Sequence, residues 1–116
     1  MTDDQAPPEA AANLFAPVHG PTADEIATIL LARPDVTIER IVSFGHASPA
    51  GFWYDQDFDE WVAVLSGAAR LAFADGEERA LLPGDHVLIP AHRRHRVVWT
   101  HPTLPTRWLA VRLRPG

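Results

Sequence analysis

The chain has 116 residues, of which 47% are hydrophobic and 22% are charged, and its formal net charge is −5. This mixture is typical of one folded domain and excludes the low-hydrophobicity, high-charge class of disordered proteins. The acidic balance argues against nucleic-acid binding, because proteins that bind phosphate backbones carry a basic surface. The absence of cysteine excludes disulfides, thiolate metal ligands and a cysteine nucleophile. No long apolar run and no basic-then-apolar N-terminus occur, so we expect no membrane span, no secretory signal and a cytoplasmic location.

The first third of the chain divides into a predicted tail and a predicted helix. Residues 1–12 are acidic and rich in proline and alanine, which indicates a flexible tail ahead of a single domain at residues 13–116. Over residues 22–33, Thr22 and Glu25 have the spacing of a capping box. The apolar residues that follow recur at helical spacing, and a proline comes directly after them. We therefore predict one short N-terminal helix.

From residue 35 onward the sequence is typical of short β-strands. Segments rich in β-branched and apolar residues are bounded by glycine and proline turns, and Asp75-Gly76 is a strong hairpin signal. The expected strand segments are 36–44, 52–65 in two halves, 69–74, 78–82, 86–89, 94–100 and 106–113. This pattern predicts an all-β protein, either a small antiparallel barrel or a sandwich.

Two sequence motifs lie in the middle of the chain. In the second motif, five residues separate Gly84 from Pro90, and His95 follows five positions after that proline. In the first motif, six residues separate Glu60 from Gly67. Both spacings resemble those of the cupin superfamily of small β-barrels. The resemblance implies that the predicted strands form an antiparallel β-barrel of jelly-roll type, with the short helix on its N-terminal side.

The first motif departs from the family pattern. Cupins usually carry two histidines ahead of the motif glutamate, where this chain has Tyr54 and Gln56. Because those positions hold a divalent metal in typical cupins, the resemblance implies a site of Tyr54, Gln56, Glu60 and His95. One imidazole, one carboxylate, one amide and one phenol bind metals more weakly than three imidazoles and a carboxylate do. A divalent metal (Fe, Mn, Ni or Zn), a metal-free pocket and a closed structural network all stay open.

Four further residues are candidates for the same site. By strand alternation, Trp99 would share the inward face with His95 and could stack on a ligand. Arg40 and Arg112 lie within strands, and either one, if it points inward, could pair with the motif glutamate or bind an acidic substrate. His92, three residues before the motif histidine, is either a second imidazole ligand or an exposed turn residue.

The resemblance leaves the function open, because one fold can host enzymes and binding proteins alike. Our leading interpretation is a small-molecule pocket inside the barrel. In an enzyme, Glu60 and His95 would be metal ligands or an acid–base pair, and Tyr54 would donate a proton or stabilise an oxyanion, in an isomerisation, a dioxygenation or a decarboxylation. The alternatives are a non-catalytic binding or sensing module and a metal-free structural dimer. We expect a homodimer, since twofold pairs are the commonest oligomers.

Overall fold

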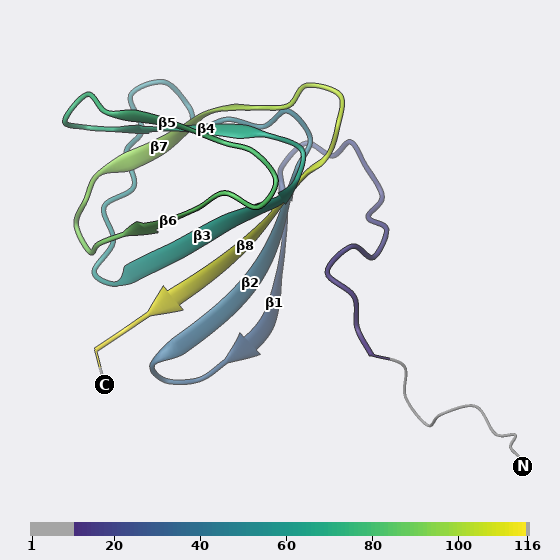
Figure 1. Ribbon diagram of the computed structural model, residues 1–116, viewed down its shortest axis with the longest axis horizontal. Coiled ribbons are helices and arrows are strands. Elements are labelled where there is room, and N and C mark those ends of the chain that lie inside the picture. The colour runs from purple at the N-terminus through teal and green to yellow at the C-terminus, as the bar shows by residue number, and fades with distance from the viewer. Residues whose placement is uncertain (1–10, 116) are drawn as a thin grey trace, which may run out of the picture.

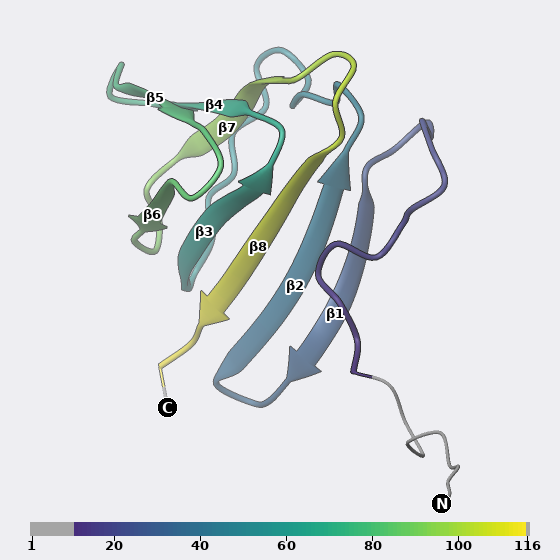
Figure 2. The ribbon, with the colours of Figure 1, turned by 45° about the vertical axis from the view of Figure 1, so that its right-hand side comes forward.

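The computed structural model describes residues 11–115, and these form two antiparallel β-sheets that face each other (Figure 1). The larger sheet has the strand order β1-β2-β8-β3-β6, and the smaller sheet has the order β5-β4-β7. Figure 2 shows β8 running through the middle of the larger sheet, between β2 and β3. The strands are β1 (Ile26–Ala32), β2 (Val36–Ser43), β3 (Asp59–Ser66), β4 (Ala69–Phe73), β5 (Glu78–Leu81), β6 (His86–Ile89), β7 (His95–Thr100) and β8 (Thr106–Leu113). This is the predicted all-β, jelly-roll type of architecture.

The hydrophobic core lies between the two sheets and follows the period-2 alternation of the strands. Val62 of β3 and Trp108 and Ala110 of β8 are buried in it, together with apolar residues of β4, β5 and β6. Burial of each large side chain stabilises the fold by about 1.5–3 kcal/mol. The same alternation continues to Glu60 and Arg112, which each lie two positions along from a core residue. The strands that build the core therefore also carry two charged side chains to its edge.

The predicted helix at residues 22–33 is wrong, because this segment forms β1 and residues 11–115 contain no helix. β1 pairs with β2 along its length, and the Thr22 hydroxyl donates to the Asp24 carbonyl instead of capping a helix. Pairing with β2 outweighs the helical pattern, and the segment Ile26–Ala32 contains three β-branched residues, which favour a strand. A register shift between Ile29 and Leu31 interrupts the period-2 alternation of β1. The sequence of β1 therefore lacks the regular pattern that predicts a strand. The described part of the chain thus offers no helix able to span a membrane.

The predicted tail falls almost wholly on residues 1–10, which lie outside the described residues. The segment that follows is attached to β2 by Arg40, whose guanidinium donates to the carbonyls of Leu14 and Ala16 at 3.1 and 3.3 Å. Figure 2 shows this segment passing in front of β1. Arg40 therefore fastens the N-terminal segment to the larger sheet.

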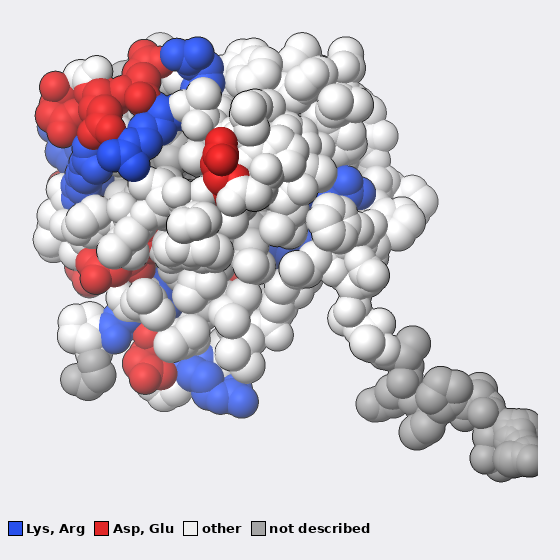
Figure 3. Space-filling model, in the orientation of Figure 1, with Lys and Arg blue, Asp and Glu red and all other residues white. Residues whose placement is uncertain are grey.

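Charged side chains of both signs gather over the β4–β5 hairpin (Figure 3). Arg70 pairs with Glu78 at 2.9 Å, and Glu77 accepts from both Arg79 and Arg93 at 2.6 Å. Exposed pairs of this kind each contribute at most about 1 kcal/mol to stability. We interpret this surface as a solvated one with mutually neutralised charges.

The glycine of the first motif is required by its position between β3 and β4. Gly67 has a φ of +80°, a conformation that side chains rarely adopt. A Cβ there would lie 2.6 Å from the Cα of Thr106 and 2.7 Å from the carbonyl oxygen of Pro105. The Thr106 hydroxyl also bridges the backbone of Ala68, accepting from its N–H and donating to its carbonyl. The turn is therefore closely packed against the start of β8.

We predict that Gly67→Ala lowers the free energy of unfolding by about 2–4 kcal/mol, because strain and a backbone clash combine. Gly76→Ala is the matched control, since Gly76 has a φ of +99° but open space around its Cα. Strain alone predicts a loss of about 1–2 kcal/mol there. Urea unfolding measures both variants, and equal losses would show that the close packing at Gly67 is not important.

Candidate functional site

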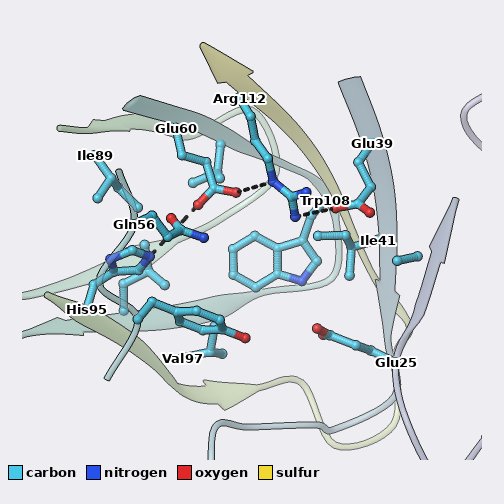
Figure 4. Close-up of a pocket in the computed structure, with 14 residues that line it drawn as sticks. Glu25, Glu39, Ile41, Gln56, Glu60, Ile89, His95, Val97, Trp108 and Arg112 are labelled. Carbon is cyan, nitrogen blue, oxygen red and sulfur yellow. Dashed lines mark hydrogen bonds and ion pairs between the residues drawn. The ribbon is translucent and has the colours of Figure 1, made fainter. Parts of the chain in front are cut away.

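A cavity of about 200 Å³ lies between the two sheets (Figure 4). One part of its wall is apolar, and the other part carries titratable and hydrogen-bonding groups. Glu25 and Ala27 are the exposed residues of the lining and mark its mouth. The apolar lining residues are Ala27, Ile41, Val62, Leu71, Ile89, Val97 and Trp108, and the polar ones are Glu25, Glu39, Tyr54, Gln56, Glu60, His95 and Arg112.

Tyr54 and Gln56 are held beside the start of β7. The backbone of Tyr54 pairs with that of His95 through hydrogen bonds of 2.8 and 3.2 Å, and the Gln56 carbonyl accepts from the His92 N–H at 2.7 Å. The Tyr54 ring stacks on the His95 imidazole, with centroids 5.4 Å apart. Glu60 lies in the larger sheet, so the chain crosses between sheets after Gln56. These side chains therefore meet across the cavity rather than along one strand.

Glu60 and Arg112 are cross-strand partners on β3 and β8. Arg112 donates to Glu39 of β2 at 2.8 Å, and its Nε lies 3.7 Å from Glu60 Oε2 (Figure 4). The two glutamates are 8% and 7% exposed, so a single guanidinium faces two buried carboxylates. Burial raises the pKa of Glu60, the Arg112 charge opposes this rise, and the charge of Glu39 adds to it. The Glu60 carboxyl therefore holds its proton to a higher pH than an exposed glutamate does.

His95 presents a lone pair to the cavity. Its Nδ1 lies 2.8 Å from the Arg93 carbonyl oxygen, which can only accept, so Nδ1 carries the proton of the neutral ring. The other nitrogen, Nε2, faces Glu60 Oε1 at 3.9 Å. Burial lowers the pKa of His95, the Arg93 charge lowers it further, and the hydrogen bond to the carbonyl opposes both. His95 is therefore neutral at pH 7 and offers Nε2 as a base or a ligand.

Two further polar groups of the lining are the Tyr54 phenol and the Glu25 carboxylate at the mouth. Burial raises the pKa of Tyr54, and the charges of Glu25 and Glu60 raise it further, so the phenol is protonated and can donate. Glu25 accepts from the Ser43 hydroxyl at 2.9 Å, and that hydroxyl accepts from the Trp108 indole N–H at 3.1 Å. This chain of hydrogen bonds fixes the Glu25 carboxylate at the rim of the cavity.

Three groups in the cavity, on Arg112, Glu60 and His95, can each form a further hydrogen bond. Arg112 Nε is buried without a hydrogen-bond partner among the described residues. The separations of 3.7 Å from Arg112 Nε to Glu60 and 3.9 Å from Glu60 to His95 Nε2 are too long for direct hydrogen bonds. Buried polar groups in folded proteins are nearly always satisfied, so this arrangement is suited to an additional polar molecule between them.

Trp99 does not line the cavity, which corrects the expectation from alternation. The residue is 39% exposed, and its ring lies 6.0 Å from that of His101. In the pairing of β4 with β7, Arg70 faces Trp99 but Leu71 faces Val97, so Val98 is an extra residue. A bulge of this kind inverts the faces of a strand, so Val97 lines the cavity together with His95, and Trp99, beyond the bulge, lies on the other face.

Arg40 and His92 also lie outside the cavity. Arg40 is bound to the N-terminal segment, on the face of β2 opposite to its neighbour Glu39. His92 is 68% exposed in its side chain and contacts Asp55 through Nδ1 at 2.8 Å. It has a φ of +65°, which is typical of a turn residue. The interpretation of His92 as an exposed turn histidine therefore holds over that of a second imidazole ligand.

Glu25, Glu39 and Trp108 line the cavity but were not among the residues predicted to do so. The period-2 alternation carried a signal for two of them, since Glu39 precedes Ile41 by two positions and Trp108 precedes Ala110 by two. No such signal existed for Glu25, because the predicted helix obscured the strand that it precedes.

The residues of the cavity do not fit the divalent metal that the resemblance to cupins implies. Among residues 11–115, no three His, Cys, Asp or Glu side chains are placed to hold a metal ion together. The Tyr54 phenol is protonated and the Gln56 amide is a weak donor, which leaves one imidazole and one carboxylate. That carboxylate already faces the positive charge of Arg112. The site therefore offers few metal ligands, and its one carboxylate already has a positive partner.

The comparison with known proteins identifies the family. The sequence profile of the cupin domain matches residues 46–112, more than half of the chain. The chain belongs to the cupin family. No curated protein sequence matches it. The cupin fold alone does not specify the reaction, because related barrels carry different sites.

Several solved structures resemble this cupin. A Ralstonia eutropha JMP134 protein with the provisional name mannose-6-phosphate isomerase is 49% identical, with a TM-score of 0.86 over 92% of this chain and 100% of its own. A cupin superfamily protein from Desulfitobacterium hafniense DCB-2 is 19% identical, with a TM-score of 0.70 over 84% of each chain. The cupin domain of an XRE family transcriptional regulator from Enterobacter cloacae is 20% identical, with a TM-score of 0.62 over 79% of this chain and 98% of its own.

We predict that His95 makes stability depend on pH. Its pKa is lower in the folded state than in the unfolded chain, so the unfolded state binds more protons as the pH falls below about 6.5. The stabilisation by neutral His95 is therefore present above pH 6.5 and is lost as the pH falls through the folded pKa. Urea unfolding at several pH values should show the stability difference between wild type and His95→Gln shrinking towards acid. A difference that is constant or grows towards acid would contradict the burial of a neutral imidazole.

Proposed function

We propose that this cupin binds a small, uncharged, hydroxylated molecule in its cavity, and that Glu60 and His95 move a proton on it. The observation that carries the proposal is the gap between Arg112 Nε, Glu60 and His95 Nε2. Arg112 Nε–H can only donate, His95 Nε2 can only accept, and a carboxyl group can accept. A hydroxyl group donates and accepts at once, so it complements this set.

The dimensions and the lining of the cavity support a small ligand. An apolar cavity of about 150 Å³ holds one benzene molecule, so about 200 Å³ accommodates roughly six to ten non-hydrogen atoms. The indole of Trp108 and the side chains of Ile41 and Val97 provide an apolar wall. Such a wall suits the C–H face of a compound whose hydroxyls point towards the polar groups.

The charge of the cavity argues against a phosphorylated ligand, although the Ralstonia eutropha relative bears the name of a sugar-phosphate isomerase. Among the described lining residues, Arg112 is the only permanently basic side chain, and Glu39 and Glu60 both face it. Glu25 adds a third carboxyl group at the mouth. Removing water from a phosphate among these carboxyl groups would be unfavourable. The Arg112 guanidinium would not compensate for this, because it is already paired with Glu39 and Glu60. We therefore propose an uncharged sugar or hydroxycarbonyl compound.

The protonation states of the site support acid–base chemistry. Neutral His95 offers Nε2 as a base, and Glu60, with its raised pKa, can supply or take up a proton. The protonated Tyr54 phenol can donate to an oxygen on which negative charge develops. These are the groups needed to remove a proton beside a carbonyl and to return it to the adjacent carbon. Of the three reaction classes considered, isomerisation fits this set best.

The test is a binding panel of uncharged compounds that fit the cavity, namely glycerol, dihydroxyacetone and erythrose, with dihydroxyacetone phosphate as the anionic comparison. We expect at least one uncharged compound to raise the melting temperature and to bind in calorimetry. Glu60→Gln and Arg112→Gln should each weaken that binding about tenfold or more, because each removes a hydrogen bond to a charged group. The exposed Arg114→Gln is the charge-matched control and should bind normally.

Proton transfer is measured separately, by following deuterium uptake at carbon in D₂O with NMR. We expect wild type to exchange a proton beside the carbonyl of the bound compound, and His95→Gln not to do so. Binding without exchange would leave a non-catalytic binding module. Tighter binding of dihydroxyacetone phosphate than of dihydroxyacetone, or no binding of any uncharged compound, would contradict the proposed ligand class.

The predicted homodimer stays part of the proposal. Ile29 and Leu30 of the edge strand β1 are 61% and 44% exposed, and Phe15 is 54% exposed. Large exposed apolar side chains of this kind are available for an interface between two copies. Analytical ultracentrifugation would detect the dimer, and a monomer at high concentration would contradict it.

A further inference from the structure

Arg112 occupies the electrostatic centre of the cavity. Its strand, β8, lies between β2 and β3, which carry Glu39 and Glu60. The guanidinium donates to Glu39 at 2.8 Å and places its Nε 3.7 Å from Glu60 (Figure 4). The Glu60 carboxylate is the group that would be the anionic metal ligand of the site, and Arg112 already provides its counter-charge.

We propose that Arg112 is a built-in cation that takes the electrostatic role of a metal ion in this cupin and keeps divalent cations away from Glu60 and His95. This inference concerns the charge of the site and does not depend on which small molecule the cavity binds.

The physical basis is repulsion in a poorly solvated space. A divalent ion bound by Glu60 and His95 would have to lie between Glu60 Oε1 and His95 Nε2, which are 3.9 Å apart. The guanidinium contacts the other oxygen of the same carboxylate, so the two cations would be only a few ångströms apart. Burial of Glu60 and His95 reduces the screening by water, and the repulsion is correspondingly strong.

Removal of the guanidinium should make the binding of a divalent cation favourable. Glu39 and Glu60 would then both face the cavity without a counter-ion, with Glu60 lying 3.9 Å from the imidazole of His95. A carboxylate and an imidazole are ligands that Mn²⁺, Ni²⁺ and Zn²⁺ accept, with water in the remaining positions. A buried pair of unpaired carboxylates is also unfavourable by itself, which adds to the gain from binding a cation.

The experiment titrates Mn²⁺ and Ni²⁺ into tag-free wild type, Arg112→Leu, Arg112→Gln and Arg112→Lys, using calorimetry and the Mn²⁺ electron paramagnetic resonance signal. Arg114→Leu is the control, because it removes the same charge from an exposed position two residues away. We expect the Leu and Gln variants to bind at least about tenfold more tightly than wild type. The Lys variant and the control should bind like wild type, because the cavity keeps its cation in both.

Second substitutions identify which residues bind the metal, and separate measurements establish which variants fold. The gain in Arg112→Leu should disappear when His95→Ala or Glu60→Gln is added, and circular dichroism establishes which variants fold. Arg112→Gln retains an amide donor for Glu39, so it tests the inference if the Leu variant does not fold. Near-stoichiometric metal in wild type that is lost in His95→Ala and Glu60→Gln would overturn the inference. Equal affinities of wild type and the folded uncharged variants would overturn it too.

Discussion

The pairing of one guanidinium with two buried carboxylates is the interaction on which the cavity depends. A carboxylate that is buried without a partner costs several kcal/mol, so Glu39 and Glu60 are tolerated because Arg112 lies between them. The sheet order β2-β8-β3 makes this arrangement available, since the central strand can reach both neighbours. The topology of the larger sheet thereby sets the charge of the cavity.

Much of the fold follows from local sequence patterns. The strands after residue 35 are marked by turn residues and β-branched segments, and the ranges predicted for β6 and β8 agree with the structure. The spacing of the cupin motifs also led to Glu60 and His95, which lie beside one cavity. Tyr54 and Gln56 line the same cavity. Strand alternation does not explain their positions, because the chain passes from one sheet to the other before Glu60.

The errors arise where strand pairing departs from regular alternation. β1 and β7 each contain a register irregularity, and these led to the predicted helix and to the expected inward position of Trp99. A bulge is a property of two paired strands, so one segment read by itself does not reveal it. Glu25 was missed for the same reason. The pairing of Arg112 with Glu39 was not predicted either, since it joins residues 73 positions apart.

The altered first motif replaces two imidazoles by a phenol and an amide, and it leaves His95 as the one imidazole of the described lining. The lone pair on Nε2 of His95 is needed in every chemical role considered for this site. Long-range ¹H–¹⁵N NMR of the His95 ring at pH 7.5 tests this most directly. The structure predicts a neutral ring with the proton on Nδ1 and a bare Nε2. A proton on Nε2, or a charged imidazolium, would contradict the account.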